Sequence, residues 1–100
     1  MDDEKKDEPK EIHIQVELDP VIAQGVYTNL AMVNHTETEF TLDFLFIQPQ
    51  QPKAAVRSRV ISSPKHTKRL IEALKDNLAK YEKRFGTIQV SETEGDLIVH

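Results

Sequence analysis

The side chains with the chemistry for catalysis or metal binding are four histidines and a few serines and acids. The histidines fall at no metal-ligand spacing, and the sequence has no cysteine to complete a site. Ser58, Ser62 and Ser63 lie close to His66, but no glycine-x-serine-x-glycine motif surrounds them. Asp43 belongs to an alternating strand pattern, which favours an edge or interface position over a general acid. We therefore expect no enzyme, no metal and no cofactor.

A second candidate chemistry is anion binding, because the charges are unevenly distributed. Residues 1–52 carry 11 acidic and 3 basic side chains, a net charge of −8, whereas residues 53–86 carry a net charge of +7. This asymmetry indicates either a basic binding face or two halves that attract each other, within a subunit or across a dimer. We favour attraction between the halves.

The basic half still supplies candidates for anion or nucleic-acid contacts. Arg57 and Arg59 are predicted on one face of a strand, followed by basic residues at the start of a helix. The isoelectric point near 5.5 argues against phosphate binding, so nucleic acid is the less favoured partner. The candidates are Arg57, Arg59, Lys65, Lys68 and Arg69.

Residues 63–86 are predicted to form one long amphipathic helix. Ser63 is a suitable N-cap, Pro64 fits the first helical position, and Gly86 can end the last turn. Between these ends, apolar residues recur every three or four positions and form one stripe. Thr67, Leu70, Ile71, Leu74, Leu78, Tyr81 and Phe85 make up this stripe. His66 lies in the first turn.

Four strands are predicted before this helix, at residues 11–18, 26–33, 40–47 and 54–61. The first alternates strictly between apolar and polar residues, which is typical of a half-buried strand. Asp19 and Pro20 are expected to end it, and a short connection containing Gly25 follows. Residues 34–39 are predicted as a turn between two strands, and residues 48–52 as a loop.

The predicted fold is α+β, a four-stranded antiparallel sheet followed by one long C-terminal helix, in the order β-β-β-β-α. Residues 1–10 are expected to be a disordered acidic arm, and residues 11–86 a single domain. Residues 87–100 are expected to be an acidic tail, in which residues 87–90 and 97–99 could add short strands. The acidic N-terminus is unlike a signal peptide, and no apolar run is long enough to span a membrane. We therefore expect a cytoplasmic protein with no membrane association.

One helix covers only one face of such a sheet. We expect the face bearing Phe40, Leu42, Phe44 and Phe46 to pack against the helix stripe. The other face then keeps an apolar patch, which predicts a homo-oligomer, most simply a dimer, or a polypeptide partner. The residues expected at this interface are Tyr27, Ala31, Val33, Leu45, Ile47 and Ile61.

Several blocks of the sequence resemble one family of short prokaryotic proteins, the domain of unknown function 3467. The blocks are residues 25–36, 39–44, 56–61, 63–70 and 77–86. The resemblance covers about residues 12–86, so it leaves out the acidic arm and the tail. It implies a conserved folding unit, but no established activity and no site residues.

The predicted layout is also similar, more distantly, to the export chaperone SecB, an oligomer with a four-stranded antiparallel sheet. This likeness in layout implies that apolar patches hold an unfolded or partner polypeptide, although fold transfers function poorly. We therefore expect a non-enzymatic, oligomeric protein-interaction module of chaperone or adaptor type. The alternative is a nucleic-acid-binding regulator that uses the basic strand and helix face.

Overall fold

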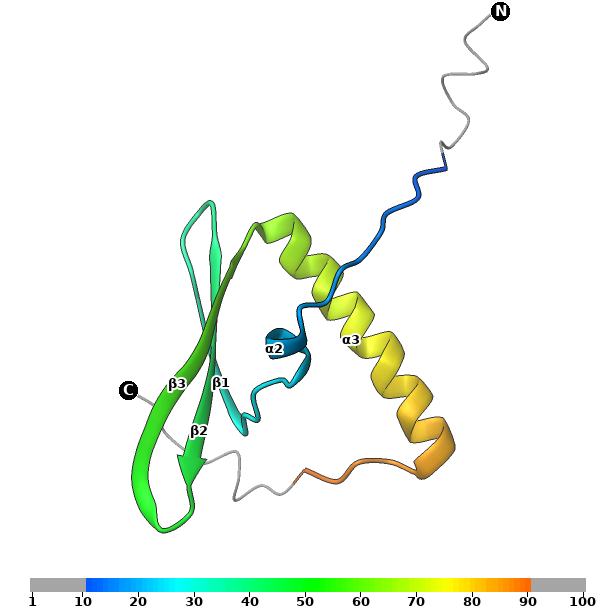
Figure 1. Cartoon of the computed structure of the whole chain (residues 1–100). Coiled ribbons are helices and arrows are strands. Elements are labelled where there is room, and N and C mark those ends of the chain that lie inside the picture. Colours follow the sequence, from blue (N-terminus) through cyan, green and yellow to red (C-terminus); the bar gives the residue numbers. More distant parts are fainter. Residues whose placement is uncertain (1–10, 91–100) are drawn as a thin grey trace, which may run out of the picture.

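The computed structural model describes residues 11–90, which form a three-stranded antiparallel sheet and two helices (Figure 1). A short helix, α2 (Pro20–Ala23), precedes the strands β1 (Leu30–His35), β2 (Phe40–Gln48) and β3 (Gln51–Ser62). The long helix α3 (Pro64–Phe85) follows. The α+β class, the antiparallel sheet and the closing helix are confirmed. The predicted disordered arm at residues 1–10 and the short strand at 97–99 lie outside the described residues.

Two hairpins build the sheet in the order β1-β2-β3. In the loop between β1 and β2, the Thr36 hydroxyl accepts the amides of Thr38 and Glu39, which confirms the predicted turn. Between β2 and β3, only Pro49 and Gln50 lie outside the strands, so the predicted loop is shorter than expected. Pro52 is tolerated in β3 because this strand is an edge strand, where a missing amide donor is harmless.

The predicted first strand is not part of the sheet, and the prediction of four strands was wrong for this single chain. Residues 11–18 have no strand partner in the described structure, although their alternation is typical of a strand. Their apolar side chains are exposed, with Val16 at 85%. A strand needs a neighbour for its amides and carbonyls, and alternation alone does not supply one. Residues 87–90 also form no strand.

Helix α3 has the predicted bounds and the predicted N-cap. The Ser63 hydroxyl accepts the amide of His66 at 3.2 Å, which satisfies one free donor of the first turn. At the other end, the amide of Gly86 donates to the carbonyl of Glu82 at 2.9 Å. The φ of Gly86 is +102°, a value that favours glycine, but its ψ of 163° is extended instead of helical.

The helix does not pack on the sheet as expected. Among the described elements, the pairs in substantial contact are β1 with β2 and β2 with β3. Figure 1 shows α3 diverging from the sheet after Ser62, with α2 between the two. Leu45 is the one hydrophobic residue of the described chain that is fully buried. The hydrophobic core formed by residues 11–90 of one chain is therefore very small.

Candidate interaction site

Strand register decides which side chains share a face of the sheet, because directly paired residues of antiparallel strands point the same way. Ala31 pairs with Phe44, and Val33 pairs with Leu42. We call the face bearing Phe40, Leu42, Phe44 and Phe46 the Phe face. Ala31 and Val33 therefore belong to the Phe face and not to the face of Leu45.

The Phe face is half-buried and only partly covered. Its four β2 side chains are all intermediate in exposure. Residues of the α2 region lie over it and leave an open hollow of about 500 Å³. The hollow is mainly apolar, and the residues lining it are Val21, Ile22, Gly25, Val26, Thr28, Phe44 and Ser58.

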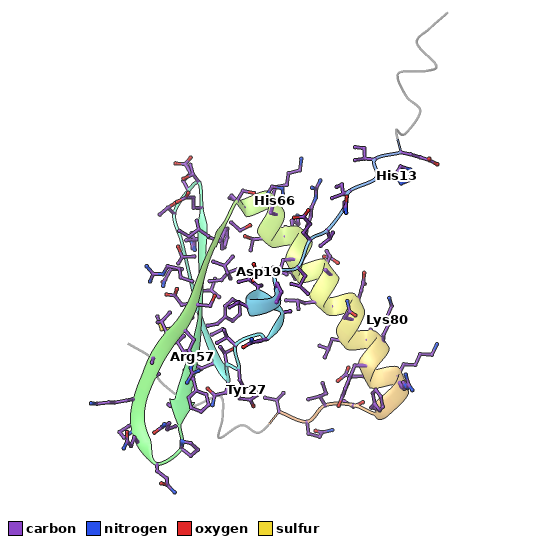
Figure 2. All side chains as sticks on the ribbon, in the orientation of Figure 1. His13, Asp19, Tyr27, Arg57, His66 and Lys80 are labelled. Atoms are coloured by element: carbon purple, nitrogen blue, oxygen red, sulfur yellow. The ribbon has the colours of Figure 1, made fainter. Side chains whose placement is uncertain are left out.

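An aromatic and cationic cluster lies beside this hollow, around Phe46. The Tyr27 ring meets the Phe46 ring edge to face, with 6.2 Å between centroids. The Arg57 guanidinium lies over the same Phe46 ring, 5.0 Å from its centroid. Figure 2 shows Tyr27 and Arg57 at the same end of the molecule. Tyr27 itself is 75% exposed, so the cluster is open to a partner.

A bulge in β3 explains why Arg57 and Arg59 point to different faces. Phe44 pairs with Ser58, but Leu45 pairs with Val56, so Arg57 is an extra residue in the ladder. Arg59 pairs with Asp43 on the opposite face. The prediction that the two arginines share a face was therefore wrong, because alternation holds only where the strand is regular.

Asp43 and Arg59 form a bidentate ion pair on the face opposite the Phe face. Arg59 donates from Nε to Oδ1 at 2.7 Å and from Nη2 to Oδ2 at 2.9 Å. The Asp43 side chain is buried, whereas the Arg59 side chain is 61% exposed. These hydrogen bonds, with the charge of Arg59, hold the pKa of Asp43 below its ordinary 3.8, although burial opposes the shift. Asp43 lies in the central strand, so of the two predicted positions the edge is excluded and an interface stays a prediction.

The six residues expected at an interface do not share one surface. Leu45, Ile47 and Ile61 lie on the face of Asp43, since Ile61 pairs with Thr41 and Ile47 with Ala54. Tyr27, Ala31 and Val33 lie toward the Phe face. Leu45 is only 4% exposed and Ile61 is 58% exposed, so within this face Ile61 and not Leu45 is open to a partner, and the interface itself stays a prediction.

The apolar stripe of α3 is exposed and has little contact with the other described elements. Leu74 is 61% exposed and Phe85 is 65% exposed, although both were expected in a core. Ile71, Leu78 and Tyr81 are also exposed. Thr67 is the exception, because its hydroxyl donates to the Ser63 carbonyl at 2.8 Å and the residue is buried.

The structure does not bring the five basic candidates together. Arg57 contacts Phe46 and Arg59 contacts Asp43. Lys65, Lys68 and Arg69 are exposed on the first turns of α3. The proposed nucleic-acid surface is thus divided among two faces of the sheet and the helix.

The serine and histidine near the start of α3 are in contact, but the contact belongs to the helix cap. Ser63 Oγ and His66 Nδ1 are 2.8 Å apart. The same Ser63 oxygen accepts the His66 amide, and no carboxylate among residues 11–90 is hydrogen-bonded to the His66 ring. Within the described part of the chain, no three potential metal ligands cluster.

Sequence reasoning missed two features that shape the Phe face. Asp19 caps α2 by accepting the Val21 amide at 2.8 Å, and the Asp19-Pro20 pair was itself the signal for a helix start. Asn29 binds the backbone of Ile47 twice, from Nδ2 to the carbonyl at 3.0 Å and at Oδ1 from the amide at 2.9 Å. No local pattern in the sequence marks that pairing.

One comparison with known proteins is positive. The family model described as "Protein of unknown function (DUF3467)" matches residues 1–90. The match is longer than the predicted resemblance and includes the acidic N-terminal residues. No curated protein and no solved structure match, so the similarity to SecB stays a prediction. None of the helices in residues 11–90 has the length and apolar character needed to cross a bilayer.

Proposed function

The chain belongs to the DUF3467 family, and we propose that it is a cytoplasmic, non-enzymatic protein-interaction module that works as a homo-oligomer. The exposed stripe of α3 carries this proposal. Helices in proteins gain most of their stability from tertiary packing, and α3 has little such packing against the other elements of residues 11–90. A second copy is the simplest source of it.

The spacing of the stripe favours the same helix of a second copy as its partner. Ile71, Leu74, Leu78, Tyr81 and Phe85 follow one another at alternating intervals of three and four residues. This is the spacing of the apolar seam through which two helices pair. Leu74, Leu78 and Phe85 are 61%, 48% and 65% exposed, so the seam is accessible to such a partner.

The Phe face offers a second, separate surface, for a polypeptide partner. An apolar side chain would fit the hollow beneath α2, and the Tyr27–Phe46–Arg57 cluster beside it offers an aromatic ring and a cation. Aromatic residues and arginine are the types that most often dominate binding energy at interfaces. We propose that this face gives the protein an adaptor or chaperone role.

The experiment compares Leu78→Glu with Lys80→Glu by native mass spectrometry of the full chain. Lys80 is exposed on α3 and points away from the sheet in Figure 2, so it is a matched control. We expect Lys80→Glu to keep the oligomer. Leu78→Glu should raise the dissociation constant by about 100-fold, because it buries an unpaired carboxylate. Retention of the wild-type mass by both variants would contradict the proposal.

Nucleic-acid binding is the competing proposal, and it now rests mainly on Lys65, Lys68 and Arg69. These side chains are exposed, so they are free to meet phosphates. Binding to duplex DNA should then weaken steeply as salt rises, with a slope set by the number of phosphates contacted. Absence of binding at low salt would remove this alternative.

A further inference from the structure

Residues 11–18, which we call the strand arm, are an extended segment with the pattern of a strand and no strand partner among the described residues. Ile12, Ile14, Val16 and Leu18 alternate with polar residues, and each of these four is at least 66% exposed. Exposed apolar surface of this kind is unfavourable in water. The backbone amides and carbonyls of the arm also have no neighbouring strand to bond among the described residues. Both the backbone and the apolar side chains of the arm therefore favour pairing with a sheet edge.

The sheet has two free edges in the described chain, β1 and β3, and they differ in length. β3 has 12 residues and β1 has 6. The eight-residue arm spans about 27 Å when extended, which fits β3 at about 40 Å but exceeds β1 at about 20 Å. Long open edges are normally covered in natural proteins because they otherwise promote uncontrolled pairing.

Charge also favours the β3 edge. The arm carries Glu11 and Glu17, and in β3 Arg59 lies on the face opposite the Phe face, where these glutamates would lie. β1, with the sequence Leu-Ala-Met-Val-Asn-His, carries no lysine or arginine. Although Arg59 binds Asp43, its side chain remains 61% exposed, so it has donors left for a further carboxylate.

A second copy is the better source of the arm than the same chain. Figure 1 shows residues 11–19 passing α3 and leading away from their own sheet. In a reciprocal exchange, each chain pairs its arm with the β3 edge of the other. The result is a closed twofold dimer in which no arm and no β3 edge is left unpaired. The exchange would supply the fourth strand that the sequence predicts and that residues 11–90 of one chain do not form.

We propose that the strand arm of one copy pairs with the outer edge of β3 in a second copy. This proposal rests on the self-association proposed above. It places the apolar side of the arm next to the Phe face and its glutamates on the side of Arg59. Backbone hydrogen bonds provide the affinity in such strand addition, and the alternate side chains fix the register.

The test is disulfide formation between two full-length copies, each carrying one new cysteine. The natural chain has no cysteine, so every cross-link reports the introduced pair. One copy, labelled with ¹⁵N, carries Ile12→Cys, Ile14→Cys or Val16→Cys. The other copy carries Ala55→Cys, Ser58→Cys or Val60→Cys on β3, whose natural residues pair with Phe46, Phe44 and Leu42 of the Phe face, or Ala31→Cys or Val33→Cys on β1 as controls. The copies are unfolded, mixed, refolded and mildly oxidised.

We expect mixed-isotope disulfide dimers between the arm and β3 in one register, because facing Cα atoms of neighbouring strands lie within disulfide reach. Equal or stronger cross-linking to β1, or no preferred register, would overturn the proposal. A single chain that carries both the arm cysteine and the β3 cysteine is also tested. Formation of the disulfide within that one chain would overturn the proposal as well. If native mass spectrometry shows an oligomer without arm–β3 cross-links, only the exchange fails. If it shows a monomer, the self-association fails as well.

Discussion

At the scale of single residues, Asp43 shows how one buried carboxylate can link two strands of a small sheet. The residue lies in the central strand, and each oxygen of its carboxylate accepts one hydrogen bond from Arg59, from Nε and from Nη2. A buried carboxylate without a partner would be strongly unfavourable, so the ion pair is needed where it lies. It also links β2 to β3 beside the bulge, where the ladder is irregular.

The pKa of Asp43 gives this pair a defined pH dependence. Because that pKa is lower in the folded state than its ordinary 3.8, the pair stabilises the fold at pH values above the unfolded pKa. The contribution is lost as pH falls through the folded pKa. Asp43→Asn should therefore lower the Tm at pH 7, and the gap from wild type should narrow below about pH 4.

Thermal unfolding measured from pH 3 to pH 8 checks this prediction. Asp76→Asn is the control, since it removes the same charge from the exposed surface of α3 without touching Arg59. A gap between Asp43→Asn and wild type that stays constant down to pH 3 would show that the carboxylate charge contributes nothing.

At the scale of elements, the sequence predicted α3 and β2 almost to the residue. Both are long and carry strong periodic patterns, and α3 also has a cap at each end. The prediction of a first strand at residues 11–18 failed for a different reason. Alternation of apolar and polar residues indicates that a segment can pair with a sheet edge, but it does not supply that edge. The Arg57 bulge could not be predicted either, because register depends on pairing across strands and not on β3 alone.

The start of β1 is a second feature that depends on a contact between residues far apart in the chain. The side chain of Asn29, which precedes β1, takes the place of a backbone partner for Ile47, 18 residues away. Asn29→Ala removes both hydrogen bonds, and we expect it to lower the free energy of unfolding by about 1–2 kcal/mol. Urea unfolding should show a lower midpoint with an unchanged slope.

Asn34→Ala provides the matched control for that measurement. Asn34 lies in β1, which begins directly after Asn29, and it is exposed; its side chain makes no hydrogen bond within residues 11–90. It should shift the midpoint by much less. An equal loss from both substitutions would show that the Asn29 bridge has no special role.

At the scale of the whole molecule, the described chain has more apolar surface to cover than it covers itself. The stripe of α3, the strand arm and the hollow on the Phe face are all open, while Leu45 is the one fully buried hydrophobic residue among residues 11–90. Local pattern identified the stripe and the arm as apolar on one side, but it assigned both to the sheet of the same chain, which does not cover them among the described residues. It could not identify the partner, because patterns record which side is apolar and not which molecule covers it.

Sedimentation equilibrium of the full wild-type chain tests this central claim most directly. We predict a mass of twice the 11.5 kDa chain, or a higher multiple, at every concentration where the protein is folded. Dilution below the dissociation constant should reduce the folded fraction together with the mass, since each chain lacks a sufficient core. A folded 11.5 kDa monomer with a cooperative unfolding transition would contradict the account.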